Sequence, residues 1–406
     1  MKILILNAGS SSQKSCLYDL AAGLPDFPVE PVWEGSIDWT AKPGAVEVKI
    51  KANHQVVKDV LPVMERQAGT RYLMNSLYQG ETAVLQDLGE IDGVGHRVVH
   101  GGEHYRASIV IDAEVKAAIA QLATFAPVHN PINLEGIETM EAILGTDTPQ
   151  VAVFDTAFHS HLPPEVYVYP GPYEWLEEGI RRYGFHGTSH QYCAQRAAQL
   201  LGRDLQELRL ITCHLGNGAS LAAIRYGYSV DTTMGFTPLD GLMMGSRSGS
   251  IDPGILIHLM RKKGYTADEL DRLLNRQSGL LGISGVGSDM RQILTEIANN
   301  NPRAKLAFDM YVHHLQALMG SMVVSLDGLD AVVFTAGVGE NAALVREAAC
   351  EAFDFLGLEL DLEKNNQHPV DVDIASPESK VRVLVIHTQE DWAIAQECWR
   401  LLQSSS

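Results

Sequence analysis

The chain has little cysteine, and none of it is paired in sequence. Its five cysteines stand at positions 16, 193, 213, 350 and 398, and no C-x-x-C pair or even-numbered framework appears. This pattern is typical of a reducing compartment and argues against a disulfide scaffold. No apolar stretch reaches the roughly 20 residues that span a bilayer, and the start of the chain lacks a signal-peptide layout. We therefore expect a cytoplasmic protein without a membrane partner.

Basic residues are also scarce. Lys and Arg number 31 against 50 Asp and Glu, which gives a formal net charge of −19. Such a balance argues against a surface for nucleic acid or for an anionic membrane. A helical H-x-x-x-H zinc pair is missing too, because His96 and His100 lie in a segment that reads as a strand.

With 406 residues the chain exceeds one comfortable core, so two domains are expected. Strand and helix patterns alternate, which indicates an α/β architecture. The predicted strands are 3–6, 46–50, 92–102, 108–112, 150–154, 208–214, 330–335 and 381–386. The predicted helices are 70–88, 114–122, 253–263, 267–276, 289–299, 303–326, one from after 341 to about 353, and one from 391 to about 402. Two more are predicted from their caps: one opened by Asn130 as N-cap, and one that Thr188 and Ser189 cap and that ends at about 201. Thr266 is the predicted cap of 267–276.

The first fifteen residues suit an anion. A buried-type strand, 3–6, breaks at Asn7 and Gly9 into the hydroxyls of 10–12, with Lys14 beyond them. Glycine-turn amides, hydroxyls and an ammonium together match a phosphate. A P-loop is excluded, because the spacing is one residue short and a strand, not a helix, follows. The alternative is an ordinary hairpin with a polar tip.

An internal repeat supports the anion reading. Residues 5–11 resemble residues 212–218 at an offset of about half the chain. The repeat predicts two related lobes, each with a strand-turn-strand, although two short glycine turns can also be alike by chance.

Four glycine-rich turns, 7–12, 214–218, 284–288 and 337–341, follow strands or open helices. Helix N-termini with small residues bind phosphate, so the set favours a nucleotide site. The last turn also fits G-x-G-x-x-A at Gly337, Gly339 and Ala342. A dinucleotide site is the weaker reading, because no parallel strand immediately precedes the acidic Asp361.

Charged side chains stand at several strand ends and in glycine-rich surroundings. Arg97 lies beside Val98 in a strand and Arg247 lies among glycines and serines, where a guanidinium suits a carboxylate or phosphoryl group or forms a structural ion pair. Asp155 and Glu390 follow strands, where carboxylates hold Mg²⁺ or cap the next helix. His129 and His186 are candidate site residues or core histidines.

Nine segments together resemble the acetate kinase family, in order and across nearly the whole chain. They are 7–12, 95–102, 126–131, 154–159, 183–190, 214–218, 241–245 with 247–249, 288–291 and 337–341. The resemblance implies reversible transfer of the γ-phosphoryl group of ATP to acetate, giving acetyl phosphate and ADP, with Mg²⁺ or Mn²⁺. It also implies a homodimer and the duplicated actin/hexokinase-like (ribonuclease H-like) fold, with two lobes around a nucleotide cleft. We expect an N-terminal lobe of 1–156, completed by a helix at about 391–406, and a nucleotide-binding lobe of 157–390.

The resemblance also assigns roles to residues. Arg97 matches the substrate arginine, Asp155 the proton acceptor, His186 and Arg247 the transition-state stabilisers, and His129 a further active-site histidine. Val99, Val128 and Pro238 match the acetate methyl pocket, and Asn7 and Glu390 the metal-associated residues. The nucleotide residues match Lys14, His214, Leu215, Gly216, Asn217, Gly218, Asp289, Met290, Arg291, Gly337, Val338, Gly339, Glu340 and Asn341.

One assigned role conflicts with acid–base chemistry. Acetate is ionised at pH 7 and has no proton to give to Asp155, so we expect Asp155 to orient Arg247 or a metal-bound water. The sequence departs from the family at Gln13, Ser15, Gly287 and Ser250, the last of which replaces a common Asp near Arg247. A propionate or butyrate kinase of the same family is the nearest alternative, followed by a non-catalytic actin-like nucleotide-binding protein.

Overall fold

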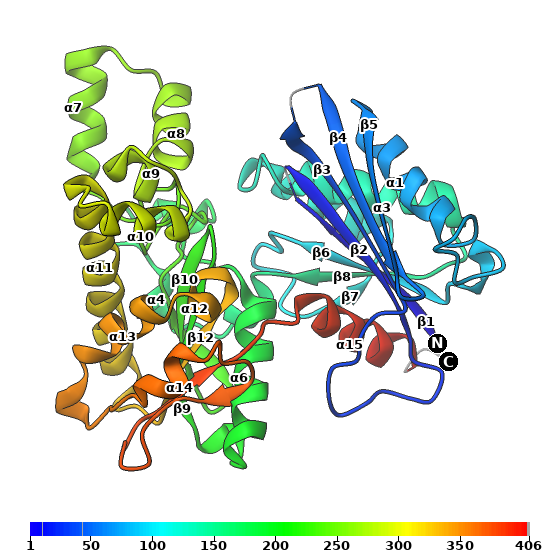
Figure 1. Cartoon of the computed structure of the whole chain (residues 1–406). Coiled ribbons are helices and arrows are strands. Elements are labelled where there is room, and N and C mark those ends of the chain that lie inside the picture. The colour runs from blue at the N-terminus through cyan, green and yellow to red at the C-terminus, as the bar shows by residue number, and fades with distance from the viewer. Residues whose placement is uncertain (10, 43, 404–406) are drawn as a thin grey trace. The chain divides into compact units, whose positions relative to one another are not determined.

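The computed structural model describes residues 1–9, 11–42 and 44–403 (Figure 1). The predicted hydroxyl of Ser10 and the last residues of the predicted closing helix, 404–406, lie outside the described residues. The chain divides into an N-terminal unit, Met1–Ala157 with the chain from Gln389 onward, and a C-terminal unit, Phe158–Thr388. Among the described residues, no helix is long and apolar enough to cross a membrane.

The N-terminal unit contains one sheet in the order β5-β4-β3-β2-β1-β6-β8-β7. Its strands are β1 Lys2–Ala8, β2 Ser12–Asp19, β3 Trp33–Lys42, β4 Ala45–Ala52, β5 Gln55–Pro62, β6 Gly93–Val98, β7 Ile109–Val110 and β8 Gln150–Phe154. Strand β1 runs antiparallel to β2 and parallel to β6, which in turn runs parallel to β8.

The C-terminal unit contains a second sheet in the order β11-β10-β9-β12-β14-β13. Its strands are β9 Arg209–Leu215, β10 Ala219–Arg225, β11 Tyr228–Thr232, β12 Ala331–Thr335, β13 Val372–Asp373 and β14 Arg382–Val385. Strand β9 runs antiparallel to β10 and parallel to β12, and β12 runs parallel to β14.

The two sheets share one topology. Strands β3-β2-β1-β6-β8 correspond in order and direction to β11-β10-β9-β12-β14, and each series carries an antiparallel edge strand, β7 or β13. The repeat seen between residues 5–11 and 212–218 therefore falls on equivalent hairpins, β1–β2 and β9–β10. The predicted α/β class and the predicted duplication are confirmed.

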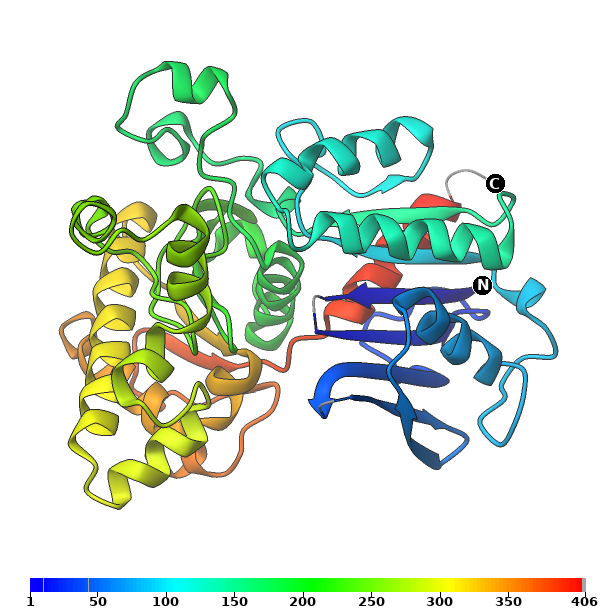
Figure 2. The ribbon, with the colours of Figure 1, turned by 90° about the horizontal axis from the view of Figure 1, so that it is seen from above.

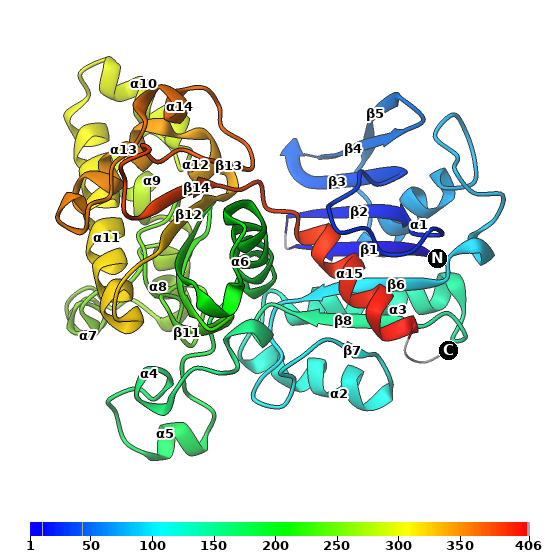
Figure 3. The ribbon, with the colours of Figure 1, turned by 90° about the horizontal axis from the view of Figure 1, so that it is seen from below.

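Helices cover both faces of the N-terminal sheet. Helices α1 Arg66–Ser76 and α3 Asn130–Leu144 lie on one face (Figure 2), and α15 Glu390–Gln403 crosses β1 and β6 on the other (Figure 3). Side chains alternate along β1 accordingly, with Leu4 and Leu6 in the core cluster of the α1 face. A Cβ on Gly95 would lie 2.6 Å from Cys398 Sγ of α15, so glycine permits the close approach of that helix.

The helices of the C-terminal unit include a long central one, α11 Pro302–Leu326, which packs on β9, β10 and β11, whereas α6 Gly187–Leu201 packs on β9 and β12. The remaining α-helices of the chain are α2 Ala113–Gln121, α4 Pro164–Tyr167, α5 Glu174–Glu177, α7 Pro253–Lys263, α8 Ala267–Arg276, α9 Gly279–Ser284, α10 Met290–Ala298, α12 Ala336–Asn341, α13 Ala343–Glu351 and α14 Leu362–Asn366. Short 3-10 turns occur at Leu88–Glu90, Leu122–Thr124, Ala157–His159, Leu205–Glu207 and Asp354–Leu356.

Most predicted elements are present, and the predicted cap at Thr266 is a complete capping box with Glu269. Four predictions of local structure were wrong. The helix expected over 70–88 is α1, which ends at Ser76. Asn130 and the pair Thr188 and Ser189 are not N-caps, because α3 begins at Asn130 and α6 at Gly187, each with no side-chain cap. The glycine-rich 337–341 is not a turn before a helix but lies within the short helix α12.

Candidate active site

The two equivalent hairpins each end in a tight glycine turn. In the first, the Gly9 amide donates to Ser12 O at 2.8 Å, and Asn7 lies opposite Lys14 in register. In the second, the Gly216 amide donates to Gly218 O at 2.9 Å. Strand, turn and returning strand were predicted for the first hairpin, and the structure has them.

Arg97 is the centre of the polar cluster in the N-terminal unit. Its Nε donates to Asp155 Oδ1 at 3.0 Å, and its Nη2 forms a second, shorter bond to Asp155 Oδ2. Its Nη1 lies 3.5 Å from Asn7 Oδ1. Asp155 is thus a bidentate partner of Arg97, a pairing that we did not expect from the sequence.

Electrostatics reinforce this pair. Burial acts to lower the pKa of Arg97, but the carboxylates of Asp155 and Glu390 outweigh it and raise the pKa above its ordinary value. The Asp155 side chain is 2% exposed, whereas that of Arg97 is 20% exposed. The guanidinium is therefore held charged and in a fixed direction, with one edge open to solvent.

Asp391 belongs to the same cluster and was missed by sequence reasoning. Burial and the neighbouring Glu390 raise the pKa of Asp391, while Lys14, a hydrogen bond with Asn7 and Arg97 act to lower it. Its Oδ1 is buried and has no hydrogen-bond partner among the residues that the structure describes. The only sequence signal was its position next to Glu390 in the first turn of α15.

The start of α3 holds the segment that follows β6. The Asn133 carboxamide accepts from the Val99 amide at 3.1 Å and donates to Ala8 O at 3.0 Å. The Asn130 carboxamide bonds both the amide and the carbonyl of His100, which explains why Asn130 is not a cap. Of the predicted substrate residues in this unit, Val99 is buried and Val128 is 43% exposed.

In the C-terminal unit, His186 and Arg247 approach the tip of the second hairpin. A Cβ on Gly218 would lie 3.3 Å from Arg247 Nη1 and 3.6 Å from His186 Nε2. His186 has a left-handed backbone, with φ of 57°, immediately before α6, and its ring stacks on His214 at 4.1 Å between centroids. Two cationic or hydrogen-bond-donating groups thus lie beside one glycine turn.

Arg247 is supported by a loop built around Asp240. Its Nη1 donates to Pro238 O at 3.1 Å, and burial lowers its pKa. Ser250, which replaces the family's common Asp, donates to Asp240 Oδ1 at 2.6 Å and accepts from the Gly241 amide at 2.9 Å. A serine at this position therefore satisfies Asp240 without placing a second carboxylate beside it.

The other departures near the first hairpin are also satisfied. Gln13 and Ser15 are each 3% exposed. Gln13 accepts from the Thr70 hydroxyl at 3.0 Å and donates to Ser15 Oγ at 3.2 Å. Gln13, Ser15 and Thr70 therefore form a buried polar trio at β2.

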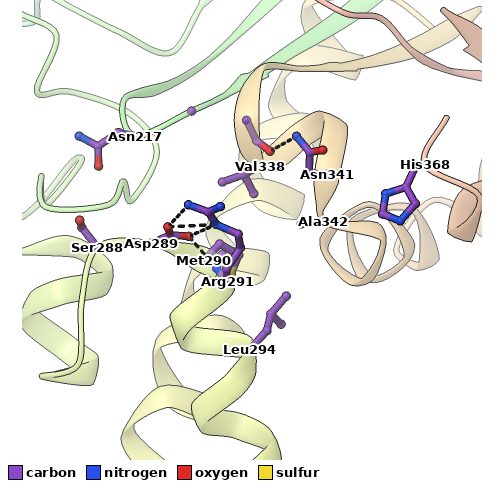
Figure 4. Close-up of a pocket in the computed structure, with 12 residues that line it drawn as sticks. Asn217, Ser288, Asp289, Met290, Arg291, Leu294, Val338, Asn341, Ala342 and His368 are labelled. Carbon is purple, nitrogen blue, oxygen red and sulfur yellow. Dashed lines mark hydrogen bonds and ion pairs between the residues drawn. The ribbon is translucent and has the colours of Figure 1, made fainter. Parts of the chain in front are cut away.

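A pocket of about 720 Å³ lies within the C-terminal unit (Figure 4). It is lined by 216–217, 288–291, 294, 337–338, 341–342 and His368. Asp289 caps α10 through the Arg291 amide and pairs with the Arg291 side chain, and Asn341 donates to Gly337 O at 2.9 Å. The volume of this pocket falls within the range of small-molecule sites.

The structure brings together eight of the predicted nucleotide residues in this pocket. They are Gly216, Asn217, Asp289, Met290, Arg291, Gly337, Val338 and Asn341. Lys14 belongs to the N-terminal unit, and His214, Leu215, Gly218, Gly339 and Glu340 do not line the pocket. Ser288, Leu294, Ala342 and His368 do line it and were not predicted.

Glu340 and a buried arginine fix the short helix α12. Glu340 accepts from the Ala336 amide at 2.9 Å and from His387 Nδ1 at 2.7 Å. Arg346, 1% exposed, donates to the carbonyls of Gly339 and Glu340 at 2.8 Å each. Burial lowers the pKa of Arg346 to about 10, and sequence analysis did not single this residue out.

No group of three or more His, Cys, Asp or Glu that could hold a metal occurs among the described residues. The Asn7 amide, Glu390 and the unpartnered Asp391 Oδ1 are nevertheless hard oxygen donors of the kind that Mg²⁺ prefers. Mg²⁺ commonly uses one or two carboxylates together with substrate phosphates, and these residues fit that pattern.

The duplicated sheet and the pocket define an α/β protein of the actin/hexokinase-like class. The model of the acetokinase family matches residues 2–396, and the chain belongs to this family. It is similar to the acetate kinase of Gloeobacter violaceus, 64% identical over 404 residues that cover 99% of this chain and 100% of that one. It is also similar to the acetate kinase of a Cyanothece species, 60% identical over 412 residues that cover 100% of both chains.

Solved structures agree. The acetate kinase of Porphyromonas gingivalis superposes with a TM-score of 0.90 at 40% identity, covering 99% of each chain. A propionate kinase from Francisella tularensis superposes with a TM-score of 0.88 at 38% identity, covering 98% of each chain. The predicted family is confirmed.

Proposed function

We propose that this chain transfers the γ-phosphoryl group of ATP reversibly to acetate, giving acetyl phosphate and ADP. The observation that carries the proposal is the pocket of 216–217, 288–291, 337–338 and 341–342 on a chain 64% identical to an acetate kinase. A carboxylate oxygen of acetate forms the new bond to the γ-phosphorus, and ADP leaves with the bridging oxygen.

The N-terminal unit supplies the carboxylate-binding arginine. Arg97 carries a fixed positive charge beside the buried Asp155, and its side chain is 20% exposed. A guanidinium edge matches the two oxygens of a carboxylate. Val99, Val128 and Pro238 are assigned to the methyl group of the acid, and His129 is a further site residue at the start of α3.

The C-terminal unit supplies the donors for the moving phosphoryl group. His186 and Arg247 lie beside Gly218, and such groups stabilise charge that builds up on the equatorial oxygens. The pocket residues hold the nucleotide, with His214, Leu215, Gly339 and Glu340 as their structural neighbours. Lys14 is assigned to the nucleotide from the first hairpin.

A divalent cation, Mg²⁺ with Mn²⁺ as a substitute, is assigned to Asn7 and Glu390. When bound, it neutralises charge on the nucleotide phosphates. Asn7 lies beside Arg97 and Glu390 begins α15, and their side-chain oxygens are the ligands that we propose for the cation.

Propionate is the second candidate acceptor, because the chain is also similar to a propionate kinase at 38% identity. One methylene in an apolar pocket changes affinity by only about 1–3 kcal/mol. The test is hydroxamate formation by the purified chain with ATP, Mg²⁺ and acetate, propionate or butyrate. We expect the highest kcat/KM with acetate. A maximum with propionate would reassign the substrate, and no product from any acid would overturn the kinase assignment.

We further propose a cytoplasmic homodimer. All five cysteines are buried thiols. Helix α7 contains no buried residue and exposes the apolar side chains of Ile255, Ile257 and Met260, which a second copy would cover. Light scattering of the native chain should give twice the chain mass, and Ile257→Glu should shift it towards the monomer. A monomeric native chain would contradict the proposal.

A further inference from the structure

A chain of buried hydrogen bonds runs behind His186. His186 Nδ1 lies 2.9 Å from Ser220 Oγ, and the same oxygen lies 2.8 Å from His190 Nε2. His190 Nδ1 lies 2.7 Å from Thr212 Oγ1. Thr212, His190 and Ser220 are each 0% exposed, so water does not compete for these bonds.

The number of protons restricts this chain to two arrangements. A serine hydroxyl has one proton, and two ring nitrogens share Ser220 Oγ. If both nitrogens carried protons, the hydroxyl would have no acceptor among the described residues. If neither did, one nitrogen would remain unsatisfied. One nitrogen must therefore donate to Ser220 and the other must accept from it.

Thr212, at the far end of this series of hydrogen bonds, decides between the two proton arrangements. If His186 Nδ1 donated, the Thr212 hydroxyl would have to point at Ala222 O, which lies 3.5 Å away. In the opposite arrangement Thr212 donates to His190 Nδ1 over 2.7 Å, His190 Nε2 donates to Ser220, and Ser220 donates to His186 Nδ1. Only the second arrangement uses short bonds throughout.

Burial supports a neutral His190. Desolvation, with smaller effects of His159 and His214, lowers the pKa of His190 well below its ordinary value. A neutral ring carries one proton and can therefore accept at Nδ1 while donating at Nε2.

We propose that Thr212, His190 and Ser220 are positioning residues that hold His186 as the neutral tautomer with its proton on Nε2. The Nε2 edge is the one next to Gly218. His186 then donates a hydrogen bond to the transferred phosphoryl group without being protonated to imidazolium. This inference rests on the role proposed above for His186, but the tautomer itself can be measured without any turnover.

The first test is the tautomer of His186 by nitrogen NMR of histidine-labelled protein at pH 8. The His186 signals are assigned by their loss in His186→Gln. We expect an unprotonated Nδ1 and a protonated Nε2. A protonated Nδ1 in the native protein would overturn the proposal, whether or not the chain is a kinase.

The second test removes single hydrogen-bond donors from the series of hydrogen bonds behind His186. Ser220→Ala should produce a mixture of His186 tautomers and lower kcat about tenfold, the value of one buried hydrogen bond, with little change in either KM. His190→Leu should do the same. His190→Gln, whose amide nitrogen can donate to Ser220, should retain the native tautomer and most of kcat.

A matched control is a serine that bonds His159, whose ring lies 5.7 Å from that of His190. Ser229 Oγ bonds His159 Nδ1 at 2.7 Å but is not part of the chain behind His186. Ser229→Ala should leave the His186 tautomer and kcat unchanged. If Ser220→Ala also leaves the tautomer unchanged, or if His190→Gln behaves as His190→Leu, the proposal is wrong.

Discussion

Asp155 and Arg97 form a two-bond ion pair in the N-terminal unit. Two bonds join the guanidinium to a carboxylate that is 2% exposed. Since acetate is already ionised at neutral pH, this geometry favours a carboxylate that orients Arg97 over one that removes a proton. The orienting role was predicted, but with Arg247 or a metal-bound water as its object.

Asp155→Asn tests that role. An amide offers one acceptor and turns two N–H groups towards the guanidinium, so Arg97 loses its direction. We expect kcat/KM for acetate to fall on the order of 100-fold, as for other buried charge pairs deprived of one partner. Steady-state kinetics at saturating ATP and Mg²⁺ measure it.

The control is Asp373→Asn, which alters a more exposed arginine–aspartate pair, Arg382 Nε to Asp373 Oδ2 at 2.7 Å, outside the proposed site. It should leave kcat/KM within about twofold. Unchanged acetate kinetics in Asp155→Asn would contradict the orienting role.

The sequence identified Arg97 and Asp155 singly but not as a pair. They lie 58 positions apart, and they meet because β6 and β8 are neighbours in register, with Arg97 opposite Val153. Strand order sets such contacts, and local pattern contains no information about it. Asp391 was missed for the same reason, since its neighbours come from β1, β2 and β6.

At the scale of elements, α12 shows how tertiary contacts override local propensity. Its sequence, AGVGEN, is rich in glycine and predicted a turn, yet it forms a helix. Glu340 bonds the amide at its start and Arg346 bonds two carbonyls at its end. Arg346 lies outside the glycine-rich motif, and Glu340 bonds an amide at the opposite end of the helix. The motif alone could therefore not predict the helix.

Gly337→Val tests whether α12 lines a nucleotide site. Gly337 lines the pocket, and a Cβ on it meets no atom within 4 Å, so we expect a larger side chain to take up pocket volume. We expect the KM for ATP to rise about tenfold while the KM for acetate stays constant. Gly320→Val on α11, where a Cβ also meets nothing within 4 Å, is the control and should change neither constant. An unaltered ATP KM in Gly337→Val would remove the nucleotide from this pocket.

Arg346→Met tests the support of the same helix. The substitution leaves buried carbonyls of Gly339, Glu340 and Asn365 without their donor. We expect the free energy of unfolding to fall by about 3 kcal/mol, measured by urea titration. Arg272→Met, on an exposed face of α8, should change it by less than about 0.5 kcal/mol. Equal stabilities would show that Arg346 is dispensable.

At the scale of the whole molecule, the half-length repeat, the equivalent sheets and the family match describe one duplication. The sequence predicted it from a short similarity, and the strand order confirms it. The resemblance implied that a helix at about 391–406 completes the N-terminal lobe, and the structure shows where the two last helices pack. Helix α6 follows β8 in the chain but packs on β9 and β12, and α15 follows β14 but packs on β1 and β6.

Buried histidines in both units predict how stability depends on pH. Burial lowers the pKa of His96, His100 and His159 to about 4 each, and unfolding returns these groups to about 6.5. Below that pH the unfolded chain binds protons that the folded chain does not. Stability is therefore fully present above pH 6.5 and is lost as the pH falls towards 4.

Urea midpoints at pH 7.5 and pH 5 measure this loss. His159→Gln should reduce the pH dependence by about one proton, whereas His104→Gln, at an exposed position, should not. The same pH dependence in His159→Gln and in the native chain would contradict the assignment.

The central claim is phosphoryl transfer from ATP to a carboxylate, and phosphorus NMR of the native chain tests it most directly. With ATP, Mg²⁺ and acetate, we expect acetyl phosphate and ADP to appear in equal amounts, and acetyl phosphate with ADP to regenerate ATP. Release of inorganic phosphate without acetyl phosphate, or no change in the ATP signals, would contradict the account.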